Sequence, residues 1–72
     1  MHLGSVTKLF HDKEYGLITT TSGGDVHFHK HCLWNISFED LTEGQEVEFE
    51  IQATNKGSLA FHIRPYVVDR LL

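Results

Sequence analysis

Cysteine and long apolar runs are scarce in this sequence, and each shortage excludes a class of protein. The single cysteine, Cys32, cannot form an intramolecular disulfide, which excludes the disulfide-stapled scaffolds of small secreted proteins. No apolar run approaches the ~18 residues that a membrane-spanning helix needs, and no basic, apolar leader opens the chain. We therefore expect no membrane segment and a cytoplasmic location.

Positive charge is also scarce, with six lysines and arginines against ten acidic residues and a net charge of −4. A nucleic-acid-binding protein usually has the opposite sign. The acids are unevenly placed, because six of the ten fall within residues 39–50, whereas residues 1–30 contain three lysines, three acids and four of the six histidines. The sequence is therefore compatible with a neutral or weakly positive face on an acidic protein.

Helical periodicity is the third absence, since no long stretch places apolar residues at i, i+3, i+4 and i+7. Instead, a chain of 72 residues with 40% hydrophobic residues, enough for one domain, is divided into short alternating runs by turn residues. These runs cover residues 3–10, 15–21, 26–31, 46–52 and 58–64. Because an open sheet of five short strands would leave exposed edges, the pattern predicts an all-β fold closed into a small barrel.

Alternation indicates which face of two of these strands is buried. In the third run, Val26 and Phe28 share one side, and His27 and His29 share the other. In residues 46–52, apolar residues alternate with three glutamates, which we expect to face solvent because burying carboxylates is prohibitive. In the first run, parity alone does not say which face is buried.

Aromatic and histidine side chains gather on the three strands between Lys8 and Lys30. Tyr15 and Leu17 lie on the strand face opposite to Ile18, so a core-facing Ile18 leaves them in solvent. Exposed rings interleaved with lysines suit unpaired bases, because bases stack on rings and ammonium groups meet phosphates. Half-exposed aromatics also occur in strands for other reasons, so the pattern alone leaves both interpretations open.

Four segments of the sequence resemble motifs of the cold-shock domain family. Residues 13–18 (KEYGLI) stand where the family has its first ribonucleoprotein motif, and residues 26–30 (VHFHK), preceded by Asp25, stand where it has the second. Residues 38–49 resemble the family's segment with a leucine, an acid and glycine-glutamine before valine-x-phenylalanine, and residues 55–57 match its late turn. The chain is therefore identified as similar to cold-shock domains.

This resemblance covers roughly residues 3–65 and implies a five-stranded antiparallel barrel of the OB type that binds single-stranded RNA or DNA. It implies a cold-shock-like domain at residues 1–66 and a tail at residues 67–72. It also implies rings for stacking on bases and lysines near phosphates. The predicted nucleic-acid-binding residues are Lys8, Phe10, Lys13, Tyr15, Leu17, His27, His29, Lys30, Phe38 and Lys56.

Five positions depart from the family's pattern. The family commonly has tryptophan at the position of Leu9, glycine at that of Glu14, and phenylalanine at those of Leu17, His27 and Lys30. Stacking is worth about 1–3 kcal/mol per base, so losing two rings weakens binding by a factor on the order of a hundred or more. Leu17 is included in the predicted site for its location alone.

Metal binding and catalysis are the competing interpretations of the histidine-rich segment. His27, His29, His31 and Cys32 are close in sequence, and histidines two apart on a strand project to one face. Tetrahedral zinc needs about four ligands, however, and no second cysteine exists to complete a matched pair. A barrel this small also offers little concavity for a nucleophilic Cys32. We predict no metal, no cofactor and no enzymatic activity.

Two interpretations of function remain open. The first is a monomer that binds single-stranded RNA or DNA with low sequence specificity, as an RNA chaperone or a modulator of transcription or translation. The second is a protein-interaction module that uses Trp34, Ile36 and residues 66–72. Residues 29–31 resemble a motif of cold-shock-like domains in larger bacterial proteins, some of which are associated with the ribosome. This resemblance makes the ribosome a further candidate partner. Trp34 suits either a stacking role or packing beside Ile36.

Overall fold

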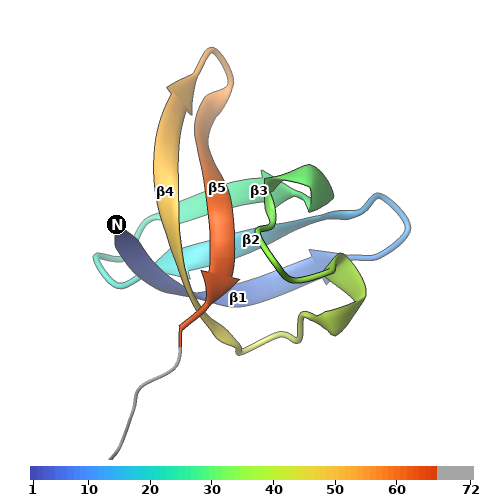
Figure 1. Ribbon diagram of the computed structural model, residues 1–72. Coiled ribbons are helices and arrows are strands. Elements are labelled where there is room, and N and C mark those ends of the chain that lie inside the picture. The colour runs from blue at the N-terminus through green and yellow to red at the C-terminus, as the bar shows by residue number, and fades with distance from the viewer. Residues whose placement is uncertain (67–72) are drawn as a thin grey trace, which may run out of the picture.

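Five strands carry most of the regular structure in the computed structural model, which describes residues 1–66 (Figure 1). The strands are β1 (His2–Phe10), β2 (Tyr15–Thr20), β3 (Asp25–His29), β4 (Glu46–Thr54) and β5 (Gly57–Pro65). Between β3 and β4 lie two short 3-10 helices, η1 (Lys30–Cys32) and η2 (Phe38–Asp40). The five predicted strands are confirmed, with ends shifted by one or two residues. The predicted tail at residues 67–72 lies outside the described residues.

The strands pair in the order β1-β2-β3-β5-β4 and close into a barrel, which confirms the predicted all-β barrel fold. Four of the pairings are antiparallel, but β3 pairs with β5 in parallel, with His27 opposite Leu59. The family resemblance implies an antiparallel barrel, and the β3–β5 pair is the exception. A hairpin forces its two strands to be antiparallel, whereas the long connection from β3 through η1, η2 and β4 allows the parallel pair that closes the barrel.

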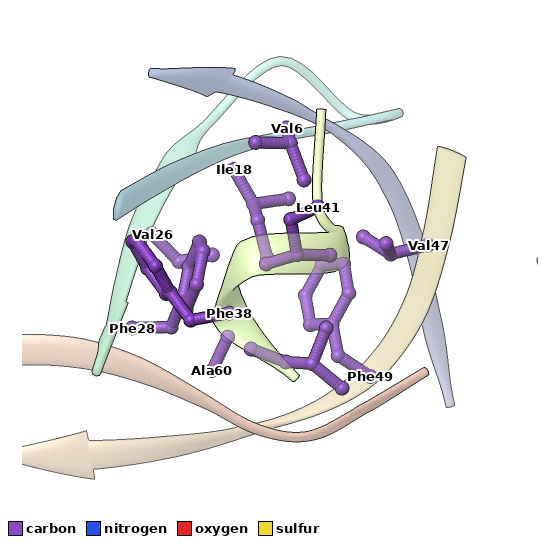
Figure 2. Close-up of a cluster of buried hydrophobic side chains, with 10 residues drawn as sticks. Val6, Ile18, Val26, Phe28, Phe38, Leu41, Val47, Phe49 and Ala60 are labelled. Atoms are coloured by element: carbon purple, nitrogen blue, oxygen red, sulfur yellow. The ribbon is translucent and has the colours of Figure 1, made fainter. Parts of the chain in front are cut away.

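Ten apolar side chains fill the barrel, and Phe28 and Phe49 are the largest of those fully buried (Figure 2). The alternation predicted for β3 is confirmed, since Val26 and Phe28 face inward. The same holds for β4, where Val47 and Phe49 are fully buried. Each such side chain contributes about 1.5–3 kcal/mol when it leaves water, so the interior fixes which face of each strand is outside.

Strand β1 changes faces partway along its length because it contains a bulge. The register with β2 shifts between Val6 and Lys8, so that Val6 is opposite Ile18 while Lys8 is opposite Leu17. Val6 is fully buried, yet Lys8 is exposed although it shares the sequence parity of Val6. Leu9 packs partly buried against the core instead. The bulge therefore places Lys8 and Phe10 on the outer surface.

Gly16 lets β1, β2 and the core approach closely. A Cβ at this position would lie 2.7 Å from the carbonyl oxygen of Lys8 and 2.7 Å from Cζ of Phe28. Any side chain there would push the Phe28 ring or the β1 backbone away. The glycine thus sets the spacing between the outer rings and the core.

The connection between β3 and β4 is partly tucked into the barrel, as its apolar composition predicts. Phe38 and Leu41 project from the η2 segment toward the interior and are buried (Figure 2). Trp34 stays half-exposed, with 50% of its surface accessible. Within residues 1–66, no helix has the length and apolarity required to cross a membrane.

Candidate nucleic-acid interface

Two cross-strand rows of side chains cover the outer surface of β1, β2 and β3. In the first row Phe10 is opposite Tyr15, and Tyr15 is opposite His29. In the second row Lys8 is opposite Leu17, which is opposite His27. We call these six residues the platform. The members of the platform are Lys8, Phe10, Tyr15, Leu17, His27 and His29.

The first row is already organised as a stacking surface. The rings of Phe10 and Tyr15 are stacked with centroids 4.6 Å apart and planes 21° from parallel. Both residues are half-buried, and His29, the next in the row, is exposed. Neighbouring rings hold one another in place, so little side-chain freedom remains to be lost when a flat ligand stacks on them. The row is suited to bind planar groups such as bases.

His31 extends the platform at the end of β3. Its ring is stacked on that of His29 with centroids 5.0 Å apart, and its backbone N–H donates to Nδ1 of His29 at 3.4 Å. The turn of η1 brings the two imidazoles together, because β3 ends at His29 and His31 lies two residues further on, within η1. His31 is absent from the predicted nucleic-acid-binding residues, although its spacing of two from His29 is visible in the sequence.

Glu14 and Lys30 form an ion pair at the edge of the platform, with Lys30 Nζ 2.9 Å from Glu14 Oε1. The hydrogen bond from Lys30 and its positive charge, together with the nearby His29 and His31, lower the pKa of Glu14. The backbone N–H of Lys30 also donates to the carbonyl of Glu14 at 3.0 Å. Lys30, predicted to lie near phosphates, is therefore held by a carboxylate here.

Glu14 also occupies an unusual backbone position. Its φ is 57°, in the left-handed region that favours glycine. The backbone N–H of Glu14 donates to the carbonyl of Phe10 at 2.7 Å, which closes the turn from β1 into β2. Glycine is the family's usual residue at this position, and the structure gives the reason for it.

The remaining predicted lysines lie at or beyond the ends of the rows. Lys8 is exposed within the second row, whereas Lys13 and Lys56 lie in the β1–β2 and β4–β5 turns. Within residues 1–66 none of the three is within 4.0 Å of a carboxylate oxygen in an ion pair. Figure 1 shows the β4–β5 turn at the tip of a hairpin that extends away from β1 and β2. Lys56 is therefore not brought into the rows.

Phe38, predicted to stack on bases, lies in the core instead. Only 5% of its surface is exposed, and its ring centroid is 6.3 Å from that of Phe28. Phe38 lies in η2 and its ring is buried, while the exposed ring of His11 lies nearly perpendicular to it with centroids 5.5 Å apart. Because Phe38 fills the barrel interior between Phe28 and the connection, it offers no free stacking face. Its burial corrects the expectation.

Beyond the platform, the outer face of the same strands becomes polar. Thr19 Oγ1 donates to Asp25 Oδ1 at 2.9 Å and also lies 3.3 Å from Thr7 Oγ1. On the other side, a carboxylate oxygen of Glu43 accepts from the backbone N–H of Leu9 at 3.1 Å. These hydroxyl and carboxylate groups form a polar border around the platform. The rings therefore occupy only the ends of β1 and β3 and the start of β2.

The histidine-rich segment does not assemble a metal centre among residues 1–66, where no three His, Cys, Asp or Glu side chains are grouped to hold an ion. Cys32 is half-buried and packs against the core. The donor atoms of this segment are instead distributed between the platform and the interior.

Comparisons with known proteins agree with this geometry. The family described as the 'Cold-shock' DNA-binding domain matches residues 2–66. A cold shock-like protein of Thermotoga maritima is 48% identical over 52 residues, covering 72% of this chain and 79% of the relative. Cold shock protein CspB of Geobacillus stearothermophilus is 38% identical over 63 residues, covering 88% of this chain and 96% of the relative. The resemblance noted in the sequence is confirmed: the chain belongs to the cold-shock DNA-binding domain family, a nucleic-acid-binding and non-enzymatic family.

Proposed function

We propose that this protein binds single-stranded RNA or DNA on the platform, without catalysis and with low sequence specificity. The observation that carries the proposal is the row formed by Phe10, Tyr15 and His29, in which the rings of Phe10 and Tyr15 are stacked on the outside of the barrel and His29 is opposite Tyr15 on the next strand. Bases in a duplex are stacked on one another and cannot reach such a row, whereas unpaired bases can. Binding is therefore selective for single strands.

Low specificity follows from the kind of contact the platform offers. Every base has a flat face, so stacking on Phe10 and Tyr15 discriminates weakly between bases. A protein that holds unpaired bases in this way disfavours hairpins in a transcript. We infer an RNA-chaperone role, with modulation of transcription or translation as its consequence.

The charges near the platform limit the electrostatic part of the affinity. Lys8 and Lys13 are exposed near the rows, and Lys30 is paired with Glu14. We expect two to four phosphates to be neutralised, which gives a slope of log affinity against log salt of about −1.4 to −2.8. A steeper slope would mean that the basic surface has been assigned to the wrong residues.

The direct test is a fluorescence titration with labelled oligo-U, oligo-dT and a matched hairpin duplex, at low and at physiological salt. We expect both single strands to bind and the duplex to be excluded. Tyr15→Ala should lower the affinity by about 1–3 kcal/mol, while Tyr15→Phe, which keeps the ring, stays near the unmodified protein. If no strand binds at low salt and tens of micromolar protein, the proposal is wrong.

A further inference from the structure

A second group of aromatic and cationic side chains lies outside the platform, on β5 and the connection that follows β3. We call it the Trp34 cluster, and it consists of Trp34, Phe61, His62 and Arg64. The ring of His62 is 4.9 Å from that of Phe61 and 5.6 Å from that of Trp34. Trp34 is 50% exposed, and Met1 is the other large apolar side chain that is exposed within residues 1–66. Its exposed ring, grouped with the rings of His62 and Phe61, offers a flat face on which a base can stack.

The Trp34 cluster continues the platform across the seam of the barrel. The parallel pairing of β3 with β5 places His27 opposite Leu59, so the outer face runs directly from the platform onto β5. Phe61 follows Leu59 by two residues and therefore shares its outer side. Trp34 is only five residues after His29, which limits their Cα separation to roughly 18 Å. A single ligand strand can therefore reach both groups.

The backbone holds Trp34 in this place. Its N–H donates to the carbonyl of Ile63 at 2.8 Å, next to the parallel bridge between Leu33 and Ile63. His62 has a φ of 53°, where the register between β4 and β5 shifts. The main chain at Trp34 is thus held against β5 by backbone contacts that do not depend on its side chain.

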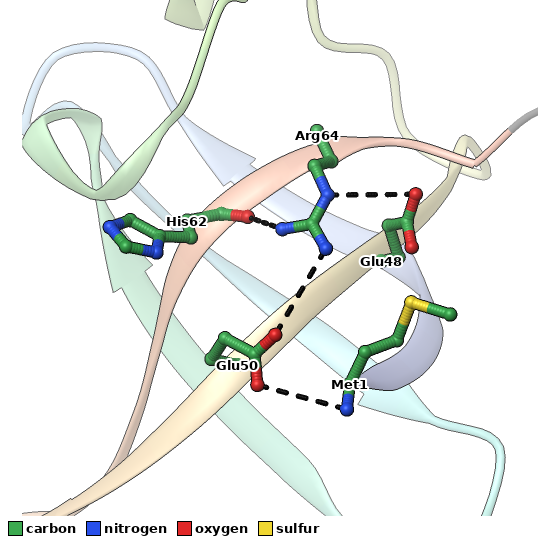
Figure 3. A network of polar contacts seen from close by, with 5 residues as sticks. All are labelled: Met1, Glu48, Glu50, His62 and Arg64. Carbon is green, nitrogen blue, oxygen red and sulfur yellow. Dashed lines mark hydrogen bonds and ion pairs between the residues drawn. The ribbon is translucent and has the colours of Figure 1, made fainter.

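Arg64 is anchored beside the indole and has few donors left for phosphate. Its guanidinium carbon lies 5.4 Å from the Trp34 ring centroid. Its nitrogens meet Glu48 Oε1 at 3.5 Å and Glu50 Oε2 at 4.0 Å, and one donates to the His62 carbonyl at 2.7 Å (Figure 3). Because two carboxylates neutralise this cation, the cluster offers ring faces for stacking but no net positive charge for phosphates.

We propose that Trp34 and His62 form a second base-stacking subsite, reached only by single strands longer than those that fill the platform. The inference rests on the proposed function, and it extends that function to residues on the far side of the β3–β5 seam. Stacking there adds affinity without neutralising a phosphate. The gain from a longer strand is therefore expected to change little with salt.

The experiment measures binding of labelled oligo-U of increasing length, from roughly 4 to 12 nucleotides, by anisotropy. With the unmodified protein, affinity rises again once the strand reaches Trp34. In Trp34→Ala this rise is lost, and the longest strand binds at least about fivefold more weakly, while the shortest is unaffected. Trp34→Phe, which keeps a ring, retains most of the rise. The salt slope for the longest strand is the same in Trp34→Ala and the unmodified protein.

Emission of the single tryptophan gives a reading that needs no variant. Long strands should quench or shift it, and short strands that fill only the platform should not. Equal affinities of Trp34→Ala and the unmodified protein at every length, or emission indifferent to long strands, would overturn the subsite and leave Trp34 as a contact for a protein. This outcome differs from failure of the proposed function, in which even the unmodified protein binds no strand and Tyr15→Ala changes nothing.

Discussion

The outer surfaces of β1–β3 and of β4–β5 differ in charge although they belong to one small barrel. The platform presents rings, imidazoles and Lys8, whereas β4 presents Glu46, Glu48 and Glu50. These acids lie beside the first half of β1, where Glu46 is opposite Ser5, and the platform occupies its second half. Net charge alone would have excluded a nucleic-acid surface, so the location of the charges decides the question.

The two surfaces also differ in how their cations are used. Arg64 on β5 is held by two carboxylates, and Lys30 beside the platform is held by one. Lys8 has no such partner within the part of the chain that the structure describes. Among the described residues Lys56 also lacks such a partner, but it lies at the tip of the β4–β5 hairpin, so the unpaired lysines near the rows are Lys8 and Lys13, where a ligand with phosphates requires positive charge.

The largest expected effect comes from removing the close approach beneath the platform. In Gly16→Ala the new Cβ would meet the Lys8 carbonyl oxygen and the Phe28 ring at 2.7 Å, so β1 and the core must separate. We expect the free energy of unfolding to fall by about 2 kcal/mol or more, as measured by urea denaturation. The rows would be displaced as well, so binding to oligo-U should weaken in the fraction that remains folded.

Gly24→Ala is the matched control for this substitution. A Cβ at Gly24 meets only the Thr20 hydroxyl, at 3.9 Å. Its stability should stay within about 0.5 kcal/mol of the unmodified protein. Equal losses in the two variants would show that the spacing at Gly16 has no special role and that the platform does not depend on it.

The second prediction tests whether local or total charge governs binding. Lys8→Gln should make the salt slope less steep by about 0.7 and weaken binding about two- to fivefold at physiological salt, because one phosphate contact is lost. Glu46→Gln, on β4, should leave the slope unchanged. If it instead strengthens binding as much as Lys8→Gln weakens it, the two surfaces act through net charge and the contrast between them disappears.

The alternating strands explain how much of the fold could be predicted. In β3, the pattern placed Phe28 inside and His29 outside, and in β4 it placed Phe49 inside and Glu48 outside, because burial has the same period as the strand. The β3 members of the platform, His27 and His29, follow once these faces are known, whereas its β1 members, Lys8 and Phe10, do not. The motif resemblance then indicated nucleic-acid binding, which alternation alone could not.

The missed features depend on contacts that alternation does not encode. The bulge after Val6 reverses the exposure of the rest of β1, and no turn residue marks it. Phe38 entered the core because a short helix turned it inward. The pairing of Lys30 with Glu14 joins a turn to the end of another strand. The family's glycine at Glu14 was the one signal that could have predicted a left-handed backbone there.

The third prediction separates the two consequences of Glu14. Glu14→Gln removes the charge but keeps a side chain on a left-handed backbone, whereas Glu14→Gly removes the charge and also the Cβ that strains this conformation. Each should release Lys30 for a phosphate, raise affinity for oligo-U about twofold and make the salt slope steeper by about 0.7. Glu14→Gly should be more stable than Glu14→Gln, with a Tm that is higher by about 2–5 °C, because glycine adopts the left-handed backbone without strain. Equal melting temperatures would mean that the turn is unstrained.

The smallest effect is the titration of Glu14 itself, which reports whether the pair with Lys30 exists in solution. Because Lys30 lowers its pKa, the Glu14 carboxylate should titrate below 4.5, the ordinary value for glutamate, when followed by NMR. A lowered pKa in the folded state stabilises the protein above the unfolded value, and this contribution is lost as pH falls through the folded pKa. In Lys30→Gln the midpoint of Glu14 should move back up, because the hydrogen bond and positive charge of Lys30 are lost. An unchanged midpoint in that variant would show that Glu14 and Lys30 are not paired in solution. Lys30 would then be a free cation beside the platform, as Lys8 is.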